Sequence, residues 1–199
     1  MTSSKIDLAW LGLDGITISV MTAATIELAW FSDETSARLD DEQFTAGEGP
    51  VYDAITGCEP ILCPALATTS RWPGFTAQAL RLGVGAVFAF PMFLGSTCVG
   101  ARMCHRQDTG PMSDAQIAAA TTLTDLLHPH LLAGDPDNDG PQGPRLRRAE
   151  VHQAAGILRE RLDVPVGDAL ACLRAYAFSQ QRPIIAVARE VTAGRLRLL

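Results

Sequence analysis

The hydrophobic positions of the first 132 residues fall into short β-like runs that alternate with turn sequences. Two pairs of runs predict two hairpins. The first pair is residues 16–20 and 26–31, and the second is residues 84–90 and 98–104, joined through residues 91–97. Strands paired in this way predict an antiparallel sheet.

Two segments of this part have helical spacing instead. Residues 75–82 predict a helix that stops at Gly83. A second helix is predicted over residues 113–132, where Ser113 and Gln116 form a capping box. Hairpins with helices at their sides predict an α+β sandwich built on an antiparallel sheet.

The pattern changes after residues 133–144, a segment rich in proline, glycine and aspartate whose largest aliphatic residue is alanine. Such a segment buries too little apolar area to fold, so it predicts a linker. Beyond it, helices are predicted over residues 145–162, over residues 167–180 and from Pro183 onward. Their apolar stripes predict a small three-helix bundle. Because about 55 residues make a marginal core, we expect it to pack against a neighbour or a second copy.

Charge separates the same two parts of the chain. Residues 145–199 hold ten arginines and five acidic residues, a balance of +5, whereas the whole chain carries −6. The first 144 residues therefore carry −11. A basic block on an acidic chain is typical of a protein that binds a polyanion with one end.

The basic residues of the first predicted helix recur on one face. Arg145, Arg148, His152, Gly156 and Arg159 are spaced by 3, 4, 4 and 3 residues. A glycine within this face would let a phosphate backbone approach closely. The alternative interpretation is a polar face that only contacts water. The arginines of the later helices favour phosphate binding, because a guanidinium group forms two parallel hydrogen bonds with phosphate.

The order of residues in this block resembles the ANTAR domain, a three-helix RNA-binding module of bacterial transcription antiterminators. The resemblance rests on the run from Val151 to Leu158 (VHQAAGIL), Ala169, Leu173-Arg174, Ala177 and Val187-Ala188. It implies that a stem-loop RNA is the partner and that the protein acts as a homodimer. The residues implied as RNA-binding are Arg148, His152, Gln153, Gly156, Arg159, Arg174, Arg182 and Arg189.

Residues 8–132 resemble a GAF domain of the kind that is coupled to ANTAR modules. The matching pieces are Asp14-Gly15, Gly47-Glu48-Gly49-Pro50 with Asp53-Ala54, Trp72-Pro73-x-Phe75, and Pro91 leading to Val99-Gly100. The resemblance implies a sensor domain with a small-molecule effector, and it identifies neither ligand-binding residues nor a cofactor. Locally, the GEGP segment predicts a tight turn before a helix that starts at Pro50, and Trp72 with Phe75 predicts a packed corner.

We therefore expect three parts: a GAF-like sensor domain over residues 1–132, a linker over 133–144 and an ANTAR-like domain over 145–199. The expected function is signal-responsive transcription antitermination through RNA, with no catalytic residues. The start of the chain has no long apolar segment and no run is long enough to span a membrane, so we expect a cytoplasmic protein.

Two alternatives stay open. The first is a GAF-type thiol reductase or redox sensor enzyme, which needs two or more of Cys58, Cys63, Cys98 and Cys104 to converge with one thiolate activated. The second is a DNA-binding or dimerisation module in the C-terminal block. No metal site is expected, because His105, His128 and His130 have no carboxylate or cysteine at ligand spacing.

Overall fold

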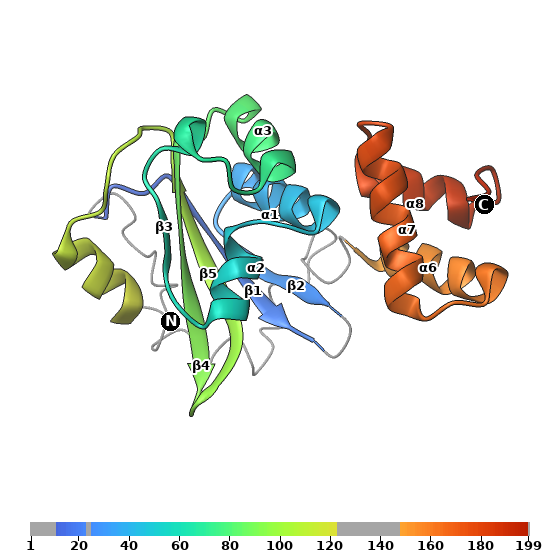
Figure 1. Cartoon of the computed structure of the whole chain (residues 1–199), viewed down its shortest axis with the longest axis horizontal. Coiled ribbons are helices and arrows are strands. Elements are labelled where there is room, and N and C mark those ends of the chain that lie inside the picture. The colour runs from blue at the N-terminus through green and yellow to red at the C-terminus, as the bar shows by residue number, and fades with distance from the viewer. Residues whose placement is uncertain (1–10, 23–24, 123–147, 199) are drawn as a thin grey trace, which may run out of the picture.

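The computed structural model describes residues 11–22, 25–122 and 148–198. Its first part is a five-stranded antiparallel sheet with the strand order β2-β1-β5-β4-β3 (Figure 1). The strands are β1 (Gly15–Met21), β2 (Ile26–Phe31), β3 (Ile61–Cys63), β4 (Ala86–Leu94) and β5 (Thr97–Arg106). Both predicted hairpins are confirmed, while β4 and β5 run further toward their shared turn than predicted and β3 was not predicted.

Three helices cover one face of the sheet (Figure 1). They are α1 (Glu34–Ala46), α2 (Pro50–Gly57) and α3 (Pro73–Arg81). The predicted helix over 75–82 corresponds to α3. Helix α1 was not predicted, because polar side chains interrupt its buried stripe: Ser36, Asp40 and Gln43 lie inside together with Leu39 and Phe44.

The other face of the sheet packs against residues 11–13 and a helix that covers residues 114–122. The predicted capping box of this helix is confirmed. The Gln116 backbone N–H donates to Ser113 Oγ at 3.3 Å, and the Ser113 N–H donates to Gln116 Oε1 at 2.9 Å. The rest of the predicted helix, and the predicted linker over 133–144, lie outside the described residues.

The predicted turn and corner are confirmed between α1 and α3. Gly47 and Gly49 adopt φ values of +70° and +150°, which favour glycine, and Pro50 occupies the first turn of α2. Trp72 and Phe75 are buried and meet edge to face, with ring centroids 6.4 Å apart. These segments fix how α1, α2 and α3 lie on the sheet.

The second part is the predicted three-helix bundle. It consists of α6 (Ala149–Leu162), α7 (Val166–Ser179) and α8 (Ile184–Thr192). Its core consists of small and branched apolar side chains from all three helices, and it is extended by Phe44 of α1. The block packs against a neighbour as expected, since Phe44 of the first part, which we call the sheet unit, belongs to its core. In the part of the chain that the structure describes, no helix is long and apolar enough to cross a membrane.

Candidate functional site at the junction of the two units

Arg148 joins the bundle to the sheet unit. It precedes α6, and only 3% of its side chain is exposed. Its guanidinium donates to the Asp40 carboxylate at 2.5 Å and to Asp41 Oδ1 at 3.3 Å. It also donates to the backbone carbonyl oxygens of Asp40 and Ile26 at 3.2 and 3.3 Å, and Glu27 lies 3.9 Å away. Arg148 is thus held by hydrogen bonds to two carboxylates and two carbonyl groups of the sheet unit, with the Glu27 carboxylate as a third ion-pair partner.

The pair formed by Arg148 and Asp40 is fully desolvated. Burial raises the pKa of the Asp40 carboxyl, although Arg148 and the Ser19 hydroxyl, which donates to Asp40 at 2.6 Å, act in the opposite direction. Burial alone would lower the pKa of Arg148, but Asp40, Asp41 and Glu27 raise it instead. Each charge of such a pair depends on its partner, so removing one of them is costly.

Phe44 lies between two arginines at the same junction. The guanidinium carbon of Arg148 is 4.0 Å from the centroid of the Phe44 ring, and that of Arg174 is 4.4 Å from it. Arg174, on α7, donates to the Tyr52 hydroxyl at 3.3 Å and to Thr25 Oγ1 at 3.5 Å. Burial lowers the pKa of Arg174 and raises that of Tyr52. The ring therefore contacts two cations of the bundle, one that immediately precedes α6 and one on α7.

His152 continues this contact one turn further along α6. Its Nε2 lies 3.0 Å from Glu27 Oε1 on β2. The predicted basic face of α6 thus faces the sheet unit at the start of the helix.

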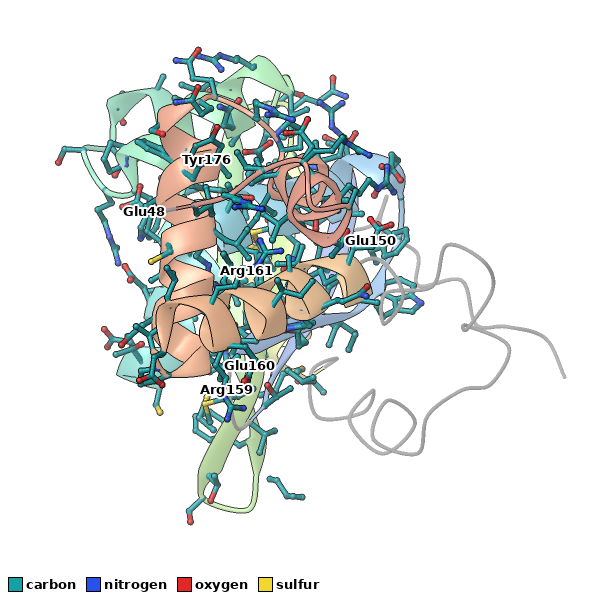
Figure 2. The ribbon with its side chains drawn as sticks, turned by 90° about the vertical axis from the view of Figure 1, so that its right-hand side faces the viewer. Glu48, Glu150, Arg159, Glu160, Arg161 and Tyr176 are labelled. Atoms are coloured by element: carbon teal, nitrogen blue, oxygen red, sulfur yellow. The ribbon has the colours of Figure 1, made fainter. Side chains whose placement is uncertain are left out.

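The remainder of that face is open to solvent. Gln153 and Arg159 are exposed, with 61% of the Arg159 side chain accessible. A Cβ added to Gly156 would meet nothing within 4 Å, so no packing contact requires glycine there. Arg159 and the neighbouring exposed Arg161 lie along α6 where it crosses in front of the sheet unit (Figure 2). The face therefore has a docked first turn and an exposed second half, where Arg159 Nε lies 3.8 Å from Glu160 Oε1.

Two other predicted RNA-binding arginines form ion pairs within the bundle. Arg182 donates to both oxygens of Glu190, at 2.8 and 3.2 Å, and Arg189 Nε donates to Glu150 at 2.6 Å. These pairs connect the start of α8 to its end and α8 to α6.

The docked arrangement leaves neither Arg148 nor Arg174 open to a partner, so their role as RNA contacts stays a prediction. In this arrangement Arg148 is buried and Arg174 is packed against Phe44 and Tyr52. Their partners come from more than 100 residues away in the sequence. The spacing along a helix shows which residues share a face, but it does not show what covers that face.

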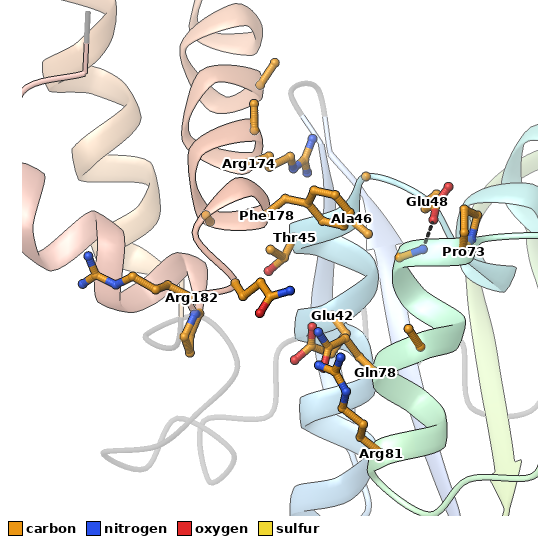
Figure 3. Close-up of a pocket in the computed structure, with 18 residues that line it drawn as sticks. Glu42, Thr45, Ala46, Glu48, Pro73, Gln78, Arg81, Arg174, Phe178 and Arg182 are labelled. Carbon is orange, nitrogen blue, oxygen red and sulfur yellow. Dashed lines mark hydrogen bonds between the residues drawn. The ribbon is translucent and has the colours of Figure 1, made fainter.

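A cleft of about 890 Å³ lies beside this junction, between α1 and α3 on one side and α7 on the other (Figure 3). Phe178 of α7 stands in it and reaches Gly74 at the start of α3, where an added Cβ would be 3.0 Å from its ring. Glu48 accepts a hydrogen bond from the Gly74 N–H at 2.8 Å. Burial, followed by the charge of Asp41, raises the pKa of Glu42 at the cleft wall. No motif in the sequence indicated this cleft.

The cysteines include one neighbouring pair, Cys58 and Cys98, and three thiols whose burial disfavours an activated nucleophile. All five are free thiols; Cys63, Cys98 and Cys104 are buried, while Cys58 and Cys172 are exposed. Burial raises the pKa of Cys63, Cys98 and Cys104, which disfavours the reactive thiolate.

His105 belongs to a buried polar cluster of the sheet unit. Its Nε2 lies 3.1 Å from Ser36 Oγ, and Ser36 also donates to Asp33 at 2.6 Å. Burial lowers the pKa of His105, and Asp33 and Asp14 act against this. Within residues 11–22, 25–122 and 148–198, no three His, Cys, Asp or Glu side chains gather as a metal site would require. His128 and His130 lie outside these residues.

Comparison with solved structures identifies the first unit as a GAF-like fold. A GAF domain region from Geobacter sulfurreducens PCA superposes with a TM-score of 0.52 at 12% identity, over 64% of this chain and 86% of that one. The GAF domain/HD domain protein from the same species gives a TM-score of 0.46 at 16% identity, over 63% and 89%. A type II free methionine-R-sulfoxide reductase from Thermoplasma acidophilum gives 0.48 at 13% identity, over 61% and 80%.

These similarities are too distant to assign an activity. No family model and no curated protein matches the chain. The comparisons therefore give no support to the resemblance between the three-helix unit and the ANTAR domain, which stays a prediction.

Proposed function

We propose that the protein is a signal-responsive RNA-binding regulator in which the GAF-like unit is the sensor and the three-helix unit binds RNA stem-loops. By holding a stem-loop in a nascent transcript, the bundle would prevent an overlapping terminator from forming. The mechanism is competition between two RNA structures and includes no bond chemistry. A cytoplasmic location and a homodimer are part of the same proposal.

The observation that carries this proposal is the open half of the basic face on α6. Gln153, Gly156 and Arg159 lie side by side on the bundle without covering contacts from the sheet unit. The space at Gly156 admits a phosphate close to the helix, and Arg159 can form a charge-assisted contact with it. The acidic balance of the rest of the chain directs a polyanion toward this unit.

The test compares two charge reversals in the full chain, measured against a pool of hairpin RNAs with randomised loops. Arg159→Glu removes a proposed phosphate contact, whereas Arg38→Glu makes the same change at an exposed position on the sheet unit. We expect Arg159→Glu to weaken RNA binding about tenfold or more. The slope of the logarithm of the binding constant against the logarithm of the salt concentration should become shallower by about one unit. Arg38→Glu should bind as the unaltered chain does.

Two results would refute this assignment. Equal binding by both variants would remove α6 from the RNA contact. Tighter binding to duplex DNA than to hairpin RNA at the same salt concentration would favour the DNA-binding alternative. The oligomeric state is measured separately by light scattering, and a monomer that binds RNA normally would remove the dimer from the proposal.

A further inference from the structure

The surface of α1 that receives the bundle combines negative charge with an aromatic ring. Asp40, Asp41 and Phe44 lie within two turns of this helix, and Glu27 adds a carboxylate from the adjacent strand β2. All four contact Arg148, and Phe44 also contacts Arg174. We name these four residues the acidic-aromatic patch.

The contacts of this patch match those that arginines make with RNA. Carboxylate and phosphate oxygens accept the same charge-assisted hydrogen bonds from guanidinium, and the planar guanidinium stacks on bases as it stacks on phenylalanine. The Asp40 carboxylate stands where a phosphate would lie relative to Arg148, and the Phe44 ring stands where an unstacked base would lie between Arg148 and Arg174.

We propose that the acidic-aromatic patch is an internal substitute for RNA, so that the docked arrangement is an inhibited state of the RNA-binding unit. This inference rests on the proposed function. Arg148 and Arg174 contact either the patch or RNA, while Gln153, Gly156 and Arg159 stay accessible in both states. RNA first meets the open half of the face and gains the two arginines only when the bundle leaves the sheet unit.

The measurable consequence is a reduced apparent affinity of the unaltered chain. When only a fraction of molecules is undocked, the apparent dissociation constant rises by the inverse of that fraction. A substitution on the sheet unit that weakens docking should therefore tighten RNA binding, even though it lies outside the RNA-binding unit. A mutation that strengthens binding from another unit is hard to explain by a purely structural role of the patch.

Asp41 is the best position for this test. It lies 3.3 Å from the Arg148 guanidinium, its side chain is 19% exposed, and it belongs to the sheet unit. Asp41→Arg places a positive charge against Arg148 and leaves every residue of the bundle unchanged. Glu59→Arg makes the same charge change at an exposed position between α2 and β3, so it controls for general attraction of RNA to a more positive chain.

The experiment measures binding of the randomised-loop hairpin pool and amide hydrogen exchange of α1 in the full chain. We expect Asp41→Arg to bind about tenfold or more tightly than Glu59→Arg and to exchange faster in α1. Glu27→Gln, which weakens the contacts to Arg148 and His152 without reversing a charge, should shift both readouts in the same direction by a smaller factor.

The outcomes separate this inference from the function on which it rests. If Asp41→Arg and Glu27→Gln exchange faster in α1 but bind RNA no more tightly than Glu59→Arg, the patch is not an inhibitor and the inference is overturned while RNA binding stands. If no variant binds hairpin RNA although α1 exchanges faster, the proposed function fails, and the inference fails with it.

Discussion

The two units of the chain differ in what they bury. The sheet unit has a core on each face of its sheet and encloses polar side chains, among them Ser19, Ser36, Asp40 and His105. The bundle has one core of small and branched apolar residues. Among the described residues, its single buried charged side chain is Arg148, which belongs to the junction. Polarity inside the bundle is therefore confined to the place where it meets the other unit.

This difference shows how the bundle is held. A three-helix core of this size is marginal by itself, and here it is completed by Phe44 of the sheet unit. The ion pair of Arg148 and Asp40 then fixes the position of the contact, since a desolvated charge tolerates few other partners.

The largest effect is expected at Arg148. Arg148→Ala leaves the Asp40 carboxylate buried without its cation, so we expect a loss of about 3 kcal/mol or more in the free energy of unfolding. Arg161→Ala, at an exposed position on the same helix, should change it by less than about 0.5 kcal/mol. Urea unfolding followed by circular dichroism measures both. A small loss for Arg148→Ala would mean that the pair does not hold the units together.

The next largest loss of stability is expected from a substitution inside the sheet unit. A Cβ at Gly15 would clash with side-chain atoms of Asp33, Ser36 and His105, so Gly15→Ala should cost about 1–3 kcal/mol. Tryptophan fluorescence reports this unfolding, because all three tryptophans of the chain precede residue 73. Hydrogen exchange in α6, α7 and α8 should change less than exchange in the sheet. A uniform change in both units would contradict their separate cores.

A third prediction concerns pH and the same polar interior. Burial lowers the pKa of His105 in the folded chain below its ordinary value of 6.5. Protons therefore bind more readily to the unfolded chain, and this contribution to stability is complete above pH 6.5 and is lost as the pH falls below it. The slope due to this one group is at most about 1.4 kcal/mol per pH unit.

A single variant identifies the source of that slope. His105→Gln should reduce the dependence of the unfolding free energy on pH below 6.5, as measured by urea titrations at several pH values. An unchanged slope would exclude His105 as its source.

The smallest effect is expected at the open half of α6. Gly156→Ala replaces a helical glycine where nothing obstructs a methyl group, so it should stabilise the bundle by about 0.5–1 kcal/mol. Gly167→Ala, with equally open space in the first turn of α7, is the matched control. Only Gly156→Ala should weaken binding of hairpin RNA. If both variants bind RNA equally, close approach of phosphate at Gly156 is excluded.

The two units also differ in how well the sequence predicted them. The bundle could be predicted closely, because each of its helices has an uninterrupted apolar stripe bounded by Pro165 or Pro183. Helix α1 could not, because Asp40 and Gln43 occupy interior positions that a polar pattern assigns to solvent. Asp40 is also the residue that pairs with the buried Arg148. Because its polar side chain was not expected inside, the sequence did not indicate that the two units meet there.

The central claim is that the bundle uses one face for both docking and RNA. Its most direct test is hydrogen exchange of α1 in the unaltered chain, with and without saturating hairpin RNA from the bound fraction of the randomised-loop pool. We expect RNA to speed hydrogen exchange in α1 and to slow it in the exposed half of α6. Slower or unchanged exchange in α1 with RNA bound would contradict this claim, because docking and RNA binding would then take place together.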